Sequence, residues 1–360
     1  MNKNNLLNKV LFTIGSVLFA SSVFAIPKAP CDVQEVCCED PAPGPFAFSY
    51  PKDVGLSCPR DFYARGEFLW MKGAEEGLDF TMENDATVNF TFPLENGDIK
   101  GFSTGSQEWD WRPGFRVGFG MYSNHDAWNF DLNYTYIRIK ADSVIENNPG
   151  DLLATFLAPP VNDLQMSSAS ARWSGDNSAL DLVMGKPYHV SRYFVSNPMI
   201  GIRAAWIDQD YHARYFFANI KNNVNLKNDF WGVGLRGAYE GQFLLGSGWY
   251  IYGKAAFALL FGKFDISQQA NTVGGDADYS INNSFYNVVP NTELGFGVCF
   301  SKYFNKNQYQ VGLKVGYEFH EWWNQNQLTK FYNFNPIAND TVSKSNLSFN
   351  GFTFGLNVEF

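Results

Sequence analysis

Twelve charged residues of this 360-residue chain recur at alternate positions within segments that are otherwise rich in apolar side chains. Half of them are basic and half acidic, so the set is balanced. Opposite charges that face one another across a closed space can pair and plug a narrow interior, or they can set up a transverse field across a water-filled one. The basic members are Arg65, Arg116, Arg203, Arg236, Lys254 and Lys314, and the acidic members are Glu67, Asp131, Asp181, Glu240, Glu293 and Glu318.

Histidine is the side chain most often used for proton transfer in catalysis, and the chain has four. His125 falls in an expected turn and the other three at expected loop edges. This spacing assembles no serine-histidine or aspartate-histidine set. We therefore expect a protein that is not an enzyme, with no catalytic residues, no cofactor and no metal site. The other histidines are His189, His212 and His320.

Cysteine offers a third kind of chemistry, and four of the five cysteines crowd one proline-rich segment. Disulfides persist in oxidising compartments, where this cluster has three internal pairings open to it as well as bonds to other chains. A zinc site is disfavoured because the cluster holds no histidine and lacks the paired C-x-x-C spacing. Cys299, alone in an expected strand, makes the total odd. The disulfide candidates are Cys31, Cys37, Cys38 and Cys58.

The elements that position these residues are predicted to be strands, because apolar side chains recur at every second position in ten segments. The clearest repeat covers residues 128–136. The twelve charges lie opposite the apolar stripes. A charge at the bilayer midplane costs about 2–4 kcal/mol, so the charges must face inward if the stripes face lipid. The segments are 62–70, 115–121, 128–136, 179–188, 198–208, 226–240, 248–262, 285–303, 309–320 and 347–360.

The end of the chain is typical of an outer-membrane β-barrel. Its last nine residues alternate apolar with polar side chains and finish on an aromatic one, which also resembles the signal read by the barrel-assembly machinery. Aromatic residues make up 17% of the chain, yet its mean hydropathy is −0.23. After residue 25 the longest apolar run, 255–261, is far shorter than the roughly 20 residues of a transmembrane helix. The candidate assembly signal is Phe352, Phe354, Leu356, Val358 and Phe360.

The start of the chain predicts export. Residues 1–25 have the basic start, short apolar run and Val23-Phe24-Ala25 cleavage site of a signal peptide. Residues 26–60 are interpreted as a Cys- and Pro-rich periplasmic leader, and 61–360 as the transmembrane barrel. The expected partners are outer-membrane lipid and the barrel-assembly machinery. A net charge of −9 argues against nucleic acid as a partner.

The connections between the segments alternate between short and long, as in single-chain outer-membrane barrels, whose short turns are periplasmic. Ten strands would enclose little more than packed side chains, and the long connections contain strand-like pieces at 77–82 and 87–92. We therefore predict an all-β, single-chain antiparallel transmembrane β-barrel of about 12 strands, within a range of 10 to 16, with long extracellular loops. This fold places the chain in the bacterial outer membrane.

Several stretches resemble the major outer membrane protein porins of Legionella and the related chlamydial-type proteins. The most specific is Ile207-Asp-Gln-Asp-Tyr211, and the resemblance also rests on the cysteine-bearing leader, on 62–70, 76–80 and 231–237, and on the terminal strand. It covers most of the chain after the signal peptide. It implies a pore-forming homo-oligomer, with disulfide-linked neighbours as one arrangement.

Two functions remain open at this point. The first is a porin that allows passive diffusion of small hydrophilic solutes and ions and has a structural role in the outer membrane. The alternative is a surface adhesin or host-interaction barrel with a plugged lumen. The alternation of side chains does not reveal the width of the lumen, so the sequence does not decide between them.

Overall fold

The computed structural model describes eleven stretches of the chain, all within the compact unit formed by residues 43–360. The predicted signal peptide, most of the leader with its four cysteines, and the strand-like piece at 87–92 lie outside the described residues. No helix in the described stretches is long and apolar enough to cross a membrane. The stretches are 50–51, 62–84, 97–100, 109–123, 128–146, 152–156, 166–217, 220–273, 279–331, 340–342 and 344–360.

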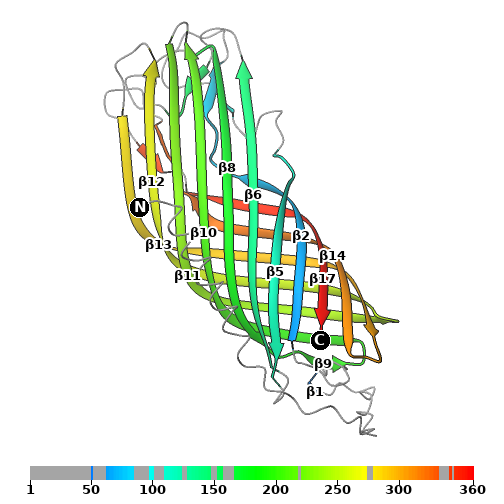
Figure 1. Cartoon of the computed structure of the whole chain (residues 1–360). Helices are drawn as coiled ribbons and strands as arrows, with labels where there is room; N and C mark the ends of the chain where they lie inside the picture. The colour runs from blue at the N-terminus through cyan, green and yellow to red at the C-terminus, as the bar shows by residue number, and fades with distance from the viewer. Residues whose placement is uncertain are drawn as a thin grey trace. The chain divides into compact units, whose positions relative to one another are not determined.

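Ten antiparallel strands form one closed barrel (Figure 1). Each strand pairs with the next one around the barrel. The last pairs with the first, where the backbone N–H groups of Phe62 and Phe360 each donate to the other residue's carbonyl oxygen, at 3.3 and 3.0 Å. Closure leaves the ten strands without an open edge. They are β2 (Phe62–Glu75), β5 (Arg112–Tyr122), β6 (Asn129–Glu146), β8 (Ser168–Gly185), β10 (Phe194–Phe217), β11 (Ile220–Gly246), β12 (Trp249–Val273), β13 (Tyr279–Phe304), β14 (Tyr309–Asn326) and β17 (Ser345–Glu359).

The predicted all-β barrel is confirmed, and its ten strands lie at the lower end of the predicted range. Each of the ten alternating segments forms one barrel strand. The piece at 77–82 does not widen the barrel, because it leads into a separate small sheet of β3 (Thr81–Asn84), β4 (Gly97–Lys100) and β7 (Leu152–Ala154). The remaining short strands are β1 (Tyr50–Pro51), β9 (Tyr188–Ser191), β15 (Thr329–Phe331) and β16 (Asp340–Val342).

The part of the barrel nearest the short turns has an apolar outer surface, which we call the lipid belt. On β5, for example, the outward Phe115, Val117 and Phe119 are 44–50% exposed, while the inward Gly114 and Arg116 are buried. The other barrel strands show the same alternation. A transmembrane barrel has this pattern because its outer face meets lipid and its inner face does not.

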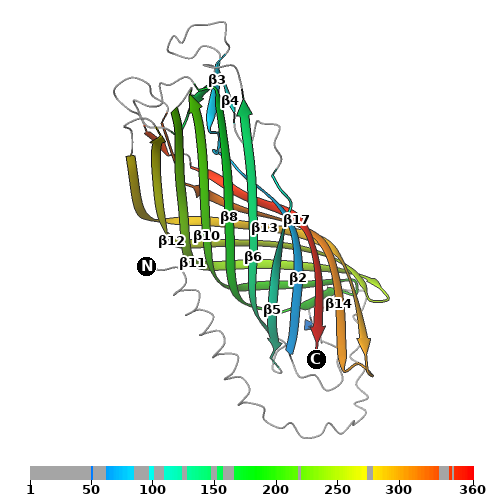
Figure 2. The same cartoon turned by 45° about the horizontal axis from the view of Figure 1, so that its top comes forward.

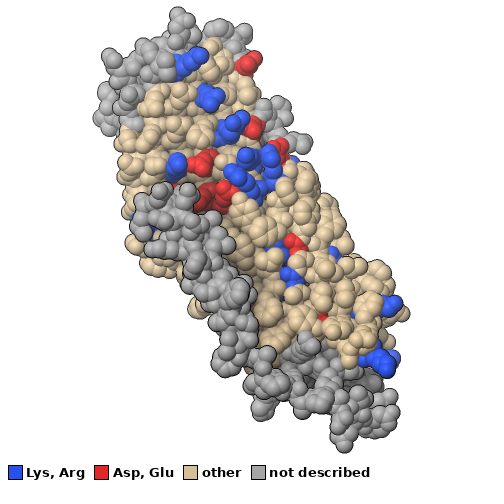
Figure 3. Space-filling view, viewed as in Figure 1, with Lys and Arg blue, Asp and Glu red and all other residues tan. Residues whose placement is uncertain are grey.

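Six strands, β6, β8 and β10 to β13, continue well beyond the lipid belt (Figures 1 and 2). They are 18 to 27 residues long, whereas about 9 to 11 residues suffice to cross a bilayer. We call their distal parts the barrel extension. Lysine, arginine, aspartate and glutamate gather on its outer face (Figure 3). The extension therefore presents a polar surface, as a structure in water must.

The inside of the extension is apolar and filled. Tyr211 and Tyr215 of β10 point inward, and their hydroxyl groups donate to the backbone oxygens of Leu78 (3.0 Å) and Phe80 (2.7 Å), which lead into β3. Phe156, beyond β7, packs against Tyr211 with the two rings tilted and their centroids 5.0 Å apart. The small sheet thus belongs to the core of the extension.

The extension revises one feature of the predicted barrel. Three of the connections expected to be long loops, 141–178, 209–225 and 263–284, are strand over most of their described residues. The outward apolar stripe ends where the lipid belt ends, and the predicted strands therefore end at that height too. Alternation itself continues, with the apolar residues now facing inward.

The lipid belt and the extension can be told apart by one substitution made at two heights on β6. Leu132 and Val144 both point outward and are 46% and 54% exposed, but Leu132 lies in the belt and Val144 in the extension. Leu132→Arg should destabilise the protein folded in lipid vesicles, lowering its free energy of unfolding by about 2–4 kcal/mol, because it places a cation against lipid. Val144→Arg should fold as the natural protein does. Equal losses in urea titrations of the two variants would contradict this boundary.

Candidate functional site

All twelve charged residues predicted from parity face the barrel interior. Eight of them are buried, and the other four are half-buried. This arrangement follows from strand alternation, since the residues on either side of each charge point to lipid or to water. Whether the twelve line a conducting pore stays a prediction. The half-buried members are Arg65, Glu240, Lys254 and Lys314.

One group of charges forms where β2, β5 and β14 face the lumen. The guanidinium of Arg116 donates to Glu67 (Nη1 to Oε2, 2.5 Å) and to Glu318 (Nη2 to Oε2, 2.8 Å). The Nζ atom of Lys314 lies 3.1 Å from Oε1 of Glu67 and 3.7 Å from Oε1 of Glu318. Two cations and two carboxylates therefore neutralise one another in a space where an unpaired charge would be costly.

A second group spans β8, β10, β11, β12 and β13. Arg203 binds both carboxylate oxygens of Asp181, with Nε to Oδ1 and Nη2 to Oδ2 both 2.6 Å, and it also contacts Glu293. Arg236 donates to Oε2 of Glu293 at 2.7 Å, and Lys254 lies 3.7 Å from the same atom. The fork of an arginine suits such paired contacts with a carboxylate.

His320 joins the two groups. Its Nδ1 atom lies 3.5 Å from Oε1 of Glu293, and its Nε2 atom lies 3.2 Å from Oε2 of Glu318. The interpretation that placed His320 at a loop edge is wrong, because β14 continues past it and it shares the inward parity of Lys314 and Glu318. That parity was the signal that could have found it. We call the joined set the charge layer: Glu67, Arg116, Asp181, Arg203, Arg236, Lys254, Glu293, Lys314, Glu318 and His320.

The charge layer fills the lumen at its level. Each of the ten barrel strands contributes, at or beside the layer, an inward residue that is less than a tenth exposed. Such burial on every side leaves these side chains little contact with water. The residues are Glu67, Arg116, Thr135, Asp181, Arg203, Arg236, Ala256, Glu293, Glu318 and Thr353.

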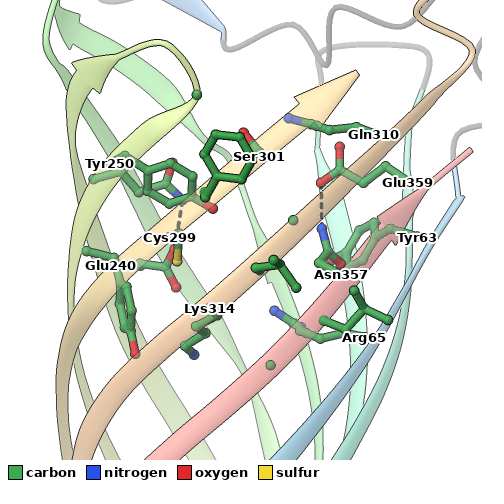
Figure 4. Close-up of a pocket in the computed structure, with 18 of the residues that line it drawn as sticks. Tyr63, Arg65, Glu240, Tyr250, Cys299, Ser301, Gln310, Lys314, Asn357 and Glu359 are labelled. Atoms are coloured by element: carbon green, nitrogen blue, oxygen red, sulfur yellow. Dashed lines mark hydrogen bonds between the residues drawn. The ribbon is translucent and has the colours of Figure 1, made fainter. Parts of the chain in front are cut away.

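Between the charge layer and the short turns, the lumen opens into a cavity of about 690 Å³, which we call the vestibule (Figure 4). Glu67 and Lys314 line it and also belong to the charge layer. Arg65, paired with Asp131, lies on one side, and Tyr250 and Cys299 lie on the other. The vestibule thus has both signs of charge in its wall and ends at the charge layer.

Tyr252 shows how closely the strands pack beside the vestibule. Its ring lies over the backbone of β14, where a Cβ atom on Gly316 would come within 2.1 Å of the tyrosine oxygen. The Nζ atom of Lys314 lies 4.6 Å from the centroid of the same ring. Glycine at position 316 leaves room for a large aromatic side chain that holds a cation, which parity alone did not indicate.

The remaining site predictions concern the cysteines and the terminal strand. Cys299 is buried and free, whereas Cys31, Cys37, Cys38 and Cys58 lie outside the described residues, so the disulfides stay a prediction. In the terminal strand, the described side chains are compatible with a lipid-facing stripe, but recognition by the assembly machinery also stays a prediction. Phe352, Phe354 and Leu356 are 45–47% exposed, and Val358 and Phe360 are half-buried.

Comparison with known families decides the relationship. The family described as Legionella pneumophila major outer membrane protein precursor matches residues 59–360. The chain belongs to this family. Membership confirms the resemblance seen in the sequence and places this family member in the bacterial outer membrane. A comparison with curated proteins finds no match.

Solved structures that are similar to this family member include an outer membrane protease and a transporter. The outer membrane protease OmpT of Escherichia coli is 10% identical, covers 85% of this chain and 99% of its own, and has a TM-score of 0.34. The toluene transporter TodX of P. putida is 8% identical, covers 84% and 90%, and has a TM-score of 0.30. A FadL homologue of Pseudomonas aeruginosa is 6% identical, covers 83% and 89%, and has a TM-score of 0.26.

The expectation that this family member is not an enzyme is corrected by these comparisons. A protease is among the similar structures, so the lack of a recognisable catalytic set in the sequence does not justify that expectation. Transporters are also among them, and likeness at this level assigns neither activity to the chain.

The charge layer makes a direct prediction about stability. Arg203→Met should lower the free energy of unfolding by about 3–5 kcal/mol, because it leaves Asp181 and Glu293 buried beside one cation fewer. Arg172→Met is the matched control, since Arg172 pairs with Asp142 on the outside of the extension with its side chain 69% exposed. That loss should stay within about 1 kcal/mol. Urea titrations of refolded protein measure both, and similar losses would mean that the layer is hydrated.

Proposed function

We propose that this family member is an outer-membrane barrel whose lumen is closed at rest. In this function the barrel supports the outer membrane without letting solutes through, and its polar extension projects from the membrane into water. The observation that supports the proposal is the charge layer, whose members are paired with one another and, apart from the half-buried Lys254 and Lys314, are buried. They come from eight of the ten barrel strands.

The energetic argument is that an ion cannot cross such a layer without separating its pairs. Removing one partner of a buried pair costs about 3–5 kcal/mol, because the other charge stays buried and uncompensated. The apolar core of the extension adds a second barrier in the described part of the lumen. Trp173, Tyr211, Phe230 and Phe264 are each no more than 2% exposed there.

In this proposal, the outer face of the extension is the part that meets other molecules. It carries exposed ion pairs such as Arg172 with Asp142 and Lys227 with Asp210. A surface adhesin or host-interaction barrel with a plugged lumen fits this arrangement. Such a role needs the extension but not a conducting lumen.

The second candidate is a porin for passive diffusion of small hydrophilic solutes and ions. The vestibule favours it, because a cavity of about 690 Å³ with Arg65, Lys314 and Glu240 in its wall would admit hydrated ions up to the charge layer. In a porin, the layer would act as a constriction that opens. The two candidates therefore differ in whether the ion pairs of the charge layer separate, and so let ions pass, at low voltage.

Conductance in planar bilayers distinguishes them. The closed-lumen proposal expects refolded protein to insert without steady current steps at low voltage, in bilayers where a known porin does give steps. Insertion is checked separately by protease protection of the vesicles used for fusion. Regular steps with a linear current–voltage relation, altered in Arg203→Met, would overturn the closed lumen and support the porin.

A further inference from the structure

The six long strands of the extension form a sheet with β6 at one side and β13 at the other (Figure 1). The ten strands close the barrel only up to the height that the shorter strands reach. Pairing of β13 with β14 stops at the pair of Asn291 with Trp322. Residues 279–290 of β13 therefore pair with β12 on one side, and no described residue pairs with them on the other.

A bulge in β14 explains why this strand leaves β13. The pairing of β14 with β17 shifts register between Trp322 and Asn326, and Asn324 has a φ of 53°, in the left-handed region. The side-chain nitrogen of Asn326 donates to the backbone oxygen of Glu76 at 2.9 Å. A bulge bends the strand that carries it, so the end of β14 is held beside the end of β2 and does not follow β13.

The ladder shows which backbone groups of β13 face the side without a partner strand. Successive residues of a strand direct their N–H and C=O groups to opposite neighbours. The N–H of Ser301 donates to the oxygen of Gly248, at the start of β12, at 2.8 Å, and the pairing of β13 with β12 has no register shift. Odd-numbered residues of β13 therefore bond to β12. The even-numbered ones that face away from β12 are Ser280, Asn282, Ser284, Tyr286, Val288 and Pro290.

The two positions nearest the membrane have no free N–H group. Val288 lies opposite Phe261 of the lipid belt, and its N–H donates to Oδ1 of Asn287 at 2.8 Å. Pro290 has no N–H to donate. Such satisfaction is needed near lipid, where an unpaired backbone group is costly. Beyond Tyr286, which lies opposite Lys263, the strand is in water. We call residues 279–287 of β13 the open edge.

The open edge lacks the features that protect exposed edges in natural sheets. Those features are charged side chains, prolines, bulges and short length. Residues 279–287 include no charged residue and no proline, and their pairing with β12 is regular. The other side of the extension is different, because β6 beyond its pairing with β5 carries charges that repel a further strand. They are Arg138, Lys140, Asp142 and Glu146.

A cavity of about 470 Å³ lies against the inner face of the open edge. Ile281 and Phe285 of β13 and Ile266 of β12 line it, together with residues at and beside β15. Its volume is in the range of ligand pockets, about 300–1,000 Å³. Side chains of a strand alternate between two faces, so a strand added to β13 would direct every second side chain toward this cavity.

We propose that the open edge binds an extended segment of another polypeptide, which adds one strand to the sheet of the extension. A polypeptide backbone supplies the alternating donors and acceptors that Asn282, Ser284 and Tyr286 require. In strand addition the main chain provides affinity, and pockets for alternate side chains provide specificity. The apolar part of the cavity wall favours a segment whose alternate residues are apolar. Strand addition rests on the proposed role of the extension in meeting other molecules, and it does not depend on whether the lumen conducts.

A second copy in the same membrane does not fit the open edge. Two copies in one membrane stand the same way up, so a two-fold axis between them runs along the membrane normal. Such symmetry brings identical backbone groups to the same height, with N–H facing N–H and C=O facing C=O. Antiparallel pairing of two identical edges would need one copy to be inverted. The occupant is therefore a segment of a different polypeptide in the water beyond the membrane.

Hydrogen–deuterium exchange of refolded full-length protein tests whether the edge is open. The amides of Asn282, Ser284 and Tyr286 should exchange at least about tenfold faster than those of Asn283 and Phe285, which bond to β12. Equal protection of the two sets in the free protein would show that the edge is already covered and would overturn the proposal.

Fluorescence anisotropy with labelled peptides tests the partner. The probes are capped decapeptides that alternate valine, leucine or phenylalanine with threonine, and members of the set should bind saturably. Methylating alternate backbone amides should weaken binding at least about tenfold in one phase, where the amides face β13, and should leave it unchanged in the other. Absence of saturable binding by every member, or equal effects of the two phases, would overturn strand addition.

A substitution at Asn282 provides a matched pair of variants. Asn282→Pro removes one N–H from the open edge but keeps the ladder with β12, so it should fold and bind the peptides at least about tenfold more weakly. Asn282→Ala keeps the N–H and should bind them as the natural protein does. Both should leave the conductance unchanged, which separates this test from that of the lumen.

Two results with these variants would contradict the proposal. Peptide binding by folded Asn282→Pro that equals that of Asn282→Ala would show that the peptides bind elsewhere. Loss of oligomers in Asn282→Pro without loss of peptide binding would assign the open edge to a second copy of the chain. The methylated peptides keep the proposal testable even where Asn282→Pro does not fold.

Discussion

A strand that crosses a bilayer and then continues into water has to exchange the polarity of its two faces, and the rest of this structure depends on that exchange. On β10, the outward Ile202 and Trp206 give way to Asp208 and Asp210, while the inward Arg203 gives way to Tyr211 and Tyr215. The outward side of the strand is therefore apolar at one height and charged at another. The barrel consists of two cores of opposite kind on one closed sheet, a charged one within the membrane and an apolar one beyond it.

The number of strands explains why the charges in the core within the membrane must pair with one another. Ten strands enclose a space that side chains largely fill, so a lumen lined by arginine and glutamate leaves little room for water. Charges in such a space have to neutralise one another. Arg116 between Glu67 and Glu318, and Arg203 between Asp181 and Glu293, meet that requirement. His320 connects the two groups, so the layer acts as one unit across the lumen.

The sequence predicted those parts of the structure that follow from local alternation. All ten barrel strands were found, because each has an outward apolar stripe, and the twelve inward charges followed from parity. The prediction of about 12 strands rested on the small space inside ten strands and on the strand-like pieces at 77–82 and 87–92, whereas the first of these pieces leads into a separate sheet and the charge layer occupies the lumen at its level. The extension was missed because its apolar residues face inward. Contacts such as Glu75 with Gln209, or Arg116 with Glu318, join residues more than a hundred positions apart, and no local pattern specifies such pairs.

Cysteine accessibility along β10 tests the central claim most directly, in a background from which the five natural cysteines are removed. Single cysteines would replace Ala204 in the lipid belt, Ala205 and Ala213 on the inner face, and Asp210 on the outside of the extension. A membrane-impermeant thiol reagent should label position 210 quickly, position 204 should react only with a lipophilic maleimide, and positions 205 and 213 should resist both until the protein is unfolded. Rapid labelling of positions 205 and 213 by the water-soluble reagent in folded protein would show a hydrated lumen and contradict the closed barrel.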